Sequence, residues 1–207
     1  MTDSTSRYLR ALTGGRGPAH VAAFVLAAAL PPTTSIRERR RAAARAVAAA
    51  AALLPCALAR HGARRGGDLT AMWDVARKFG RPEDLDAPDI GVRAQLDAAR
   101  LDPRLGGLLG DSAEAIAVAV ADGTRVHAPD LAPAIAAVAP LVLGAVTRVA
   151  NSAEGLAFVL TDFPAETLEA LAGLATSAMP VGRVFRVVRS RAAHAGVLGW
   201  FVSRLRS

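Results

Sequence analysis

The sequence predicts an all-α protein, a multi-helix array with two related helix–Pro–helix halves. Apolar residues make up 52% of the 207 residues but aromatic residues only 4%. Much of the apolar content is alanine, the strongest helix former, which favours closely packed helices. The chain also carries one element twice, with Pro55 in one copy and Pro140 in the other. In both copies an apolar run meets the proline and continues beyond it, so we expect two related halves.

The first 34 residues predict a helical N-terminal extension. A first helix is expected over 4–13, where Gly14 and Gly15 end it. Pro18 suits the first position of a second helix that reaches Leu30, because the missing amide of a proline costs nothing there.

The predicted central domain covers 35–150. Ser35 and Glu38 form a capping box that starts a helix through the alanine tract. Pro55 removes one hydrogen bond of that helix, so we expect a kink or a break there. Asp68 is expected to cap a further helix that closes at Gly80.

Residues 81–103 form a candidate linker between the two halves. The segment is polar and holds three prolines, although 92–101 fits one helix within it. Its acids and prolines are Glu83, Asp84, Asp86, Asp89, Pro82, Pro88 and Pro103.

The second half is expected to begin at a second capping box, Asp111 with Glu114, whose helix ends at Gly123. Residues 129–150 carry the second proline element. A C-terminal helical extension, 151–207, follows. It comprises a helix that starts at Asn151 or Ser152, a helix from Asp162 to about Met179, and a basic tail from Val181.

Charge is segregated along the chain, although the net charge is only +7. Residues 37–65 and 181–207 are strongly basic, and 66–180 are acidic. The first basic cluster, which contains candidate residues for binding an anion or a partner, comprises Arg37, Arg39, Arg40, Arg41 and Arg45. Arg37, Arg41 and Arg45 share one helix face. We expect pairing with Glu83, Asp84, Asp86 and Asp89, with external phosphates as the alternative.

The basic tail, 181–207, carries the remaining candidate residues. Its first part places apolar residues on one helical face and arginines opposite. Two aromatic residues and further arginines then follow, as in an anchor at a membrane surface. The candidates are Arg183, Arg186, Arg189, Trp200, Arg204 and Arg206. An ordinary helix docked on the core, a membrane-surface helix and a nucleic-acid contact are all open readings of the tail.

No pattern in the chain predicts catalysis. The four histidines are scattered and lack cysteine or carboxylate partners at metal-ligand spacing. Cys56 lies in an apolar run, which raises the pKa of a thiol, and 105–110 is glycine-rich without a phosphate-binding lysine. We therefore expect no enzyme, no catalytic residue, no cofactor, no metal and no small-molecule substrate. The apolar runs 46–59 and 131–147 are expected to be core helices, with membrane insertion as the alternative.

Several short motifs resemble the YidB-like bacterial proteins, a helical domain of unknown function. They are Leu53-Leu54-Pro55-Cys56-Ala57-Leu58, Gly66-Gly67, Leu105 to Gly110 and Ala139-Pro140-Leu141-Val142-Leu143, in that order. The resemblance covers roughly 40–150. This chain is richer in arginine and is longer at both ends. The resemblance implies a bacterial, helical, self-associating or partner-binding module and supplies no catalytic residues.

The sequence as a whole predicts a non-catalytic helical scaffold or protein-interaction module that self-associates as a homo-oligomer in the cytoplasm. Helical faces built from small residues can pack closely against copies of themselves. The alternative is a peripheral protein of the inner membrane that binds an anionic membrane surface through 181–207. A weaker alternative is non-specific binding of nucleic acid through both basic blocks.

Overall fold

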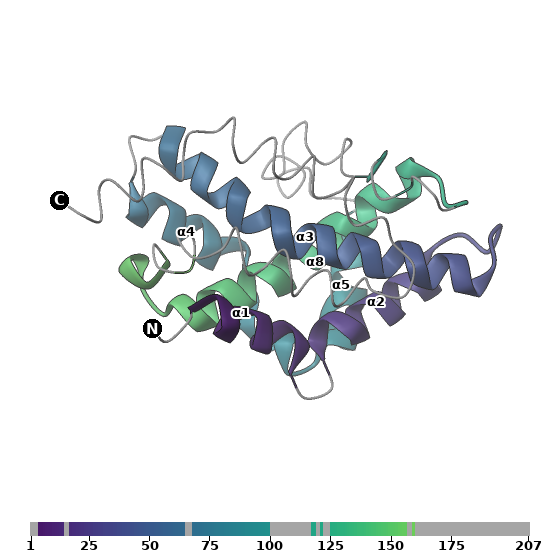
Figure 1. Cartoon of the computed structure of the whole chain (residues 1–207), viewed down its shortest axis with the longest axis horizontal. Coiled ribbons are helices and arrows are strands. Elements are labelled where there is room, and N and C mark those ends of the chain that lie inside the picture. Colours follow the sequence, from purple (N-terminus) through teal and green to yellow (C-terminus); the bar gives the residue numbers. More distant parts are fainter. Residues whose placement is uncertain are drawn as a thin grey trace.

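A computed structural model of the chain describes residues 4–14, 17–64, 68–99, 117–118, 121, 125–156 and 159. Within these residues every regular element is a helix, which confirms the predicted all-α fold class. The elements in chain order are α1 (Ser4–Thr13), α2 (Pro18–Ala29), α3 (Ile36–Arg64), α4 (Leu69–Phe79), the short 3₁₀ helix η1 (Pro82–Leu85), α5 (Pro88–Ala99) and α8 (Ala128–Ala150) (Figure 1).

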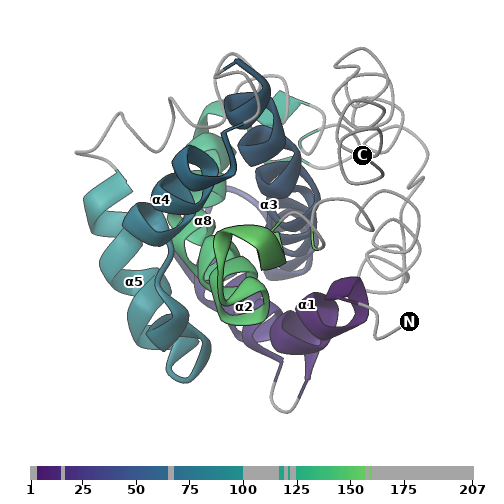
Figure 2. The same cartoon turned by 90° about the vertical axis from the view of Figure 1, so that its left-hand side faces the viewer.

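Helix α8 forms the centre of the described fold. It packs against α1, α3, α4, α5 and η1, and α3 and α5 lie on opposite sides of it (Figure 2). Every residue from 131 to 146 is buried except Ala132, Pro133 and Ala136. In the described part of the chain, α8 is the one helix long and apolar enough to cross a membrane, yet 72% of its apolar stretch is buried inside the protein. This is the packing expected of a core helix.

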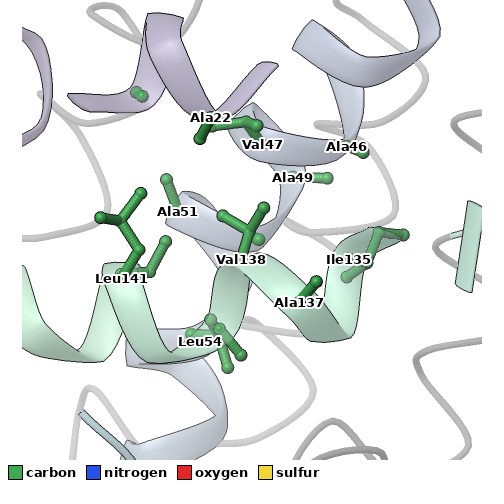
Figure 3. Packing of buried hydrophobic residues seen from close by; sticks show 14 of the residues in the cluster. Ala22, Ala46, Val47, Ala49, Ala51, Leu54, Ile135, Ala137, Val138 and Leu141 are labelled. Atoms are coloured by element: carbon green, nitrogen blue, oxygen red, sulfur yellow. The ribbon is translucent and has the colours of Figure 1, made fainter. Parts of the chain in front are cut away.

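The contact between α3 and α8 is built largely from small side chains. Ala49 and Ala51 of α3 are buried, as are Val138 and Leu141 of α8, and all four belong to one cluster (Figure 3). Small side chains allow two helix backbones to approach closely, while the branched residues fill the remaining space. The two proline-containing helices of the sequence repeat therefore pack directly against each other.

Helix α3 continues through Pro55 without a break. Of the kink or break expected there, the break is therefore wrong. Pro55 has no amide to donate to the carbonyl of Ala51, which is four residues earlier. The hydroxyl of the buried Tyr8, in α1, donates a hydrogen bond of 2.9 Å to that carbonyl instead. A side chain from another helix thus replaces the backbone donor that the proline removes.

The predicted N-terminal extension is part of the core. Tyr8 and Leu12 of α1 and Leu26 of α2 are buried. Helix α2 packs against both α3 and α5, and α1 packs against α8. These two short helices are held by packing, because isolated helices of 10 and 12 residues are marginal in water.

Residues 81–99 of the candidate linker form η1 and α5 and pack against α8 rather than crossing open solvent. The helix expected over 92–101 begins earlier, at Pro88. The backbone amide of Arg81 donates to the carbonyl of Pro140 at 2.9 Å. Glycine makes this approach feasible, since a Cβ on Gly144 would lie 2.4 Å from the carbonyl oxygen of Arg81.

Two of the predicted caps are confirmed. The amide of Glu38 donates to Ser35 Oγ at 3.3 Å, and the amide of Ser35 donates to Glu38 Oε2 at 3.3 Å, which completes the capping box of α3. Asp68 Oδ1 accepts from the amide of Ala71 at 3.0 Å and caps α4. The second capping box, Asp111 with Glu114, and the helices expected after 161 lie outside the described residues.

Candidate interaction surfaces

The residues of the first basic cluster lie at different depths. Arg37 is exposed, Arg41 is half-buried and Arg45 is only 5% exposed. Arg45 is therefore no surface candidate in this arrangement, which corrects the prediction that treated it as an exposed anion-binding side chain. The helix face they share enters the protein, since α3 passes into the core after its second turn.

Arg39 and Arg40 both contact the neighbouring helix α2, one at its terminal carbonyls and the other at an aromatic ring. Arg39 Nη1 lies 3.4 Å from the carbonyl oxygens of Ala27 and Leu30, at the C-terminal end of α2, where a cation is favoured. The guanidinium of Arg40 lies 5.7 Å from the centroid of the Phe24 ring, a cation–π distance. The start of α3 thus brings arginines over the end of α2.

An exposed apolar and basic surface results, here called the Phe24 surface and composed of Phe24, Ile36, Arg37 and Arg40. Phe24 is 58% exposed and Ile36 is 48% exposed. Arg40 lies on the same side of α3 as Ile36, four residues earlier, and Arg37, three residues earlier. Within the described part of the chain, Arg37 makes no ion pair.

A second exposed apolar side chain lies at the start of α5. Ile90 is 68% exposed and follows the exposed Asp89. Glu83 and Asp86, just before the helix, are also exposed. We call these four residues the Ile90 surface.

The acids of the Ile90 surface do not pair as the sequence predicts. Asp86 forms a two-pronged ion pair with Arg148 of α8, with nitrogen–oxygen distances of 3.0 and 2.7 Å. Arg148 also donates to the carbonyl of Pro82 at 2.7 Å. Glu83 lies 3.9 Å from Arg81. The arginines that neutralise these acids thus come from 81 and 148, which corrects the expected pairing with the first basic cluster.

The ion pair changes the titration of both partners. The hydrogen bond from Arg148 lowers the pKa of Asp86, and the same bond raises the pKa of Arg148. Asp89 makes no ion pair among the described residues. The Ile90 surface therefore keeps one acid that is not neutralised locally.

Asp84 differs from its acidic neighbours because it is only 8% exposed. Burial raises the pKa of Asp84, the charge of Glu83 raises it further, and Arg81 opposes both effects. Among the described residues, Asp84 Oδ2 has no hydrogen-bond partner. Its side chain occupies the space beside Gly91 of α5, where a Cβ would overlap it.

The described residues hold no group of three or more His, Cys, Asp or Glu side chains that could bind a metal ion. His20 is exposed in α2, and His127 is exposed immediately before α8 begins. The side chains of Cys56 and His61, together with His194, lie outside what the structure describes. The tail candidates Arg183, Arg186, Arg189, Trp200, Arg204 and Arg206 also lie outside the described residues.

Comparison with protein-family models, with curated proteins and with solved structures finds no match for this chain. The resemblance to YidB-like proteins accordingly stays a prediction. The Phe24 and Ile90 surfaces are therefore characterised by their residues, charges and exposure alone.

Sequence reasoning missed the apolar part of both surfaces. Helix α2 is apolar on all sides, so its periodicity does not reveal that Phe24 faces solvent. Ile90 was placed in a linker, where an apolar residue has no assigned face. The sequence does contain one indication that Phe24 faces solvent. Phe24 lies four residues after the polar His20, and residues four apart share a helix face.

Proposed function

We propose that the protein is a non-catalytic helical interaction module that self-associates through the Phe24 surface. The observation that supports this most directly is Arg40 over the half-exposed ring of Phe24, beside the exposed Ile36. Aromatic residues and arginines are enriched in protein interfaces and often dominate their binding energy. A cation–π pair on a surface is also already ordered, which lowers the entropy cost of binding.

The basic residues near these apolar side chains suit an interface with an acidic partner. Arg37 is exposed and has no ion pair in the described part of the chain. The first turn of α3 is an unfavourable place for a cation, because the helix dipole is positive there. A partner that brings carboxylates to Arg37 and Arg40 would relieve this repulsion as it buries Phe24 and Ile36.

Light scattering of the full chain over a range of concentrations tests the proposal. We expect a mass that rises with concentration above that of the 21.3 kDa monomer. The double variant Phe24→Ser with Ile36→Ser should remain monomeric over the same range. The matched control is Val118→Ser, which removes an exposed apolar side chain, 57% exposed, that is not part of the Phe24 surface and should leave association unchanged.

A concentration-independent monomer would refute self-association. If the protein is a monomer, two further measurements test whether its partner is a membrane or a nucleic acid. Flotation of the full chain with anionic liposomes would support the membrane alternative, which predicts dependence on 181–207. A mobility shift with DNA that weakens steeply with salt would support nucleic-acid binding.

A further inference from the structure

The Ile90 surface complements the Phe24 surface in both charge and polarity. The Phe24 surface presents Phe24 and Ile36 beside Arg37, and the Ile90 surface presents Ile90 beside Asp89; neither charge has an ion pair among the described residues. Each surface thus has an exposed apolar side chain beside a charged residue, and Arg37 and Asp89 are opposite in sign. Such complementarity selects partners and fixes their register more than it adds affinity.

The two surfaces lie toward opposite ends of α8. Near the first, Glu38 pairs with Arg125 at 3.4 Å, and Arg125 lies just before α8 begins. Near the second, Asp86 pairs with Arg148 at 2.7 Å, and Arg148 lies in the last turn of α8. A helix of 23 residues spans roughly 35 Å at 1.5 Å per residue. Phe24 and Ile90 are both exposed in the folded chain, so neither surface covers the other within one molecule.

We infer that the Phe24 surface of one copy of this chain binds the Ile90 surface of a second copy. In this arrangement Arg37 and Arg40 meet the carboxylate of Asp89, and Phe24 and Ile36 pack against Ile90. The inference rests on the proposed self-association and adds the identity of the second surface. It makes the contact heterologous, since two different patches meet.

A heterologous contact leaves one unused surface at each end of every open assembly. Copies then add head to tail and form either a closed ring or an open chain, depending on the rotation between neighbours. Self-association through identical patches would instead stop at a dimer. The mass distribution therefore carries information about which surfaces meet.

A charge-swapped pair of variants tests the contact. The first variant carries Arg37→Glu and Arg40→Glu, and the second carries Asp89→Arg with Glu83→Arg. We expect each variant alone to associate at least tenfold more weakly than the native chain in sedimentation velocity. Mixed in equal amounts, they should regain association, because every junction in an alternating assembly again joins opposite charges.

Control variants separate charge effects from loss of folding. Arg77→Glu and Asp74→Arg change exposed residues of α4 and should leave association unchanged. Ile90→Ser removes the apolar contact without touching a charge and should also weaken association. Circular dichroism on each variant checks that the helices are retained.

The outcomes distinguish this inference from the proposed function. If the native chain is a monomer at all concentrations, both are wrong. If Arg37→Glu with Arg40→Glu abolishes association while Asp89→Arg and Ile90→Ser leave it intact, the Phe24 surface is an interface but its partner is not the Ile90 surface. Failure of the mixed variants to regain association would also overturn the inference.

Discussion

The hydroxyl of Tyr8 donates a hydrogen bond of 2.9 Å to the carbonyl of Ala51, 43 residues further along the chain. Ala51 precedes Pro55 by four residues, so its carbonyl is the one that the proline leaves without a backbone donor. A buried carbonyl without a partner costs roughly 1–3 kcal/mol. The contact therefore couples α1 to α3 at the position where Pro55 removes a backbone hydrogen bond of α3.

Tyr8→Phe should destabilise the protein by about 1–3 kcal/mol, because it leaves the carbonyl of Ala51 unpaired. In a Pro55→Ala background the new amide at 55 can donate to that carbonyl, so the same change should cost markedly less. Urea unfolding of the four proteins gives the coupling energy directly. Pro140→Ala is the control background, in which the cost of Tyr8→Phe should not change. Equal costs in all three backgrounds would refute the proposed replacement.

Gly144→Ala should destabilise the protein, although alanine is the better helix former by about 1 kcal/mol. The reason is steric, since the new Cβ would lie 2.4 Å from the carbonyl oxygen of Arg81. The chain between α4 and η1 would have to move away from α8 and lose the bond from Arg81 to Pro140. Thermal unfolding measures the effect. An increase in melting temperature would show that this close approach is absent in solution.

Asp84→Asn should stabilise the protein at neutral pH. The pKa of Asp84 is raised by burial, so the folded state holds its proton more tightly than the unfolded state. Stability from this group is therefore greatest below the unfolded pKa of about 3.9 and falls as the pH rises toward the folded value. The variant should remove that fall. Urea unfolding from pH 3.5 to 7 tests this expectation, and an unchanged pH dependence would contradict it.

Asp86→Asn should act with the opposite sign. The pKa of Asp86 is lowered by the hydrogen bond from Arg148, so its contribution is present above the unfolded pKa and is lost as the pH falls. The variant should therefore weaken the protein at neutral pH and converge with the native chain in acid. Adding salt should reduce the difference, because both side chains are largely exposed. If the difference in unfolding free energy between Asp86→Asn and the native chain is the same at low and high salt, its origin is not electrostatic.

Arg37→Glu should fold at least as stably as the native chain. A cation in the first turn of a helix opposes the helix dipole, and reversing its sign should be favourable by about 0.3–1 kcal/mol. The same variant should associate more weakly if the Phe24 surface is the interface. Thermal unfolding and sedimentation velocity on one sample compare the two properties. A variant that is both less stable and monomeric would instead indicate that Arg37 supports the fold.

Local features of the fold could be predicted from the sequence because their causes are local. The capping box at Ser35, the Asp68 cap and the start of α2 at Pro18 each depend on residues within one turn. The central place of α8 could not be predicted in this way. Alanine faces such as those of α2 and α3 fit many partners equally well, so periodicity does not say which helices meet.

For the same reason, the candidate surfaces could be predicted only in part. The spacing of Arg37, Arg41 and Arg45 puts them on one helix face. It does not give the burial of each side chain, which depends on the neighbouring helices, and Arg45 is buried. Phe24 and Ile90 were missed because an exposed apolar residue resembles a core residue in sequence. Their exposure is a property of the assembled helices.

The central position of α8 has a consequence for synthesis of the chain. The ribosome makes α1 to α5 first, and α8, against which α1, α3, α4 and α5 pack, is complete only at Ala150. At 5–20 residues per second, the alanine-rich face of α3 remains without α8 for a time on the order of ten seconds. The nascent chain therefore exposes its packing surfaces throughout that interval. Its folding yield should depend on how fast the ribosome reaches α8.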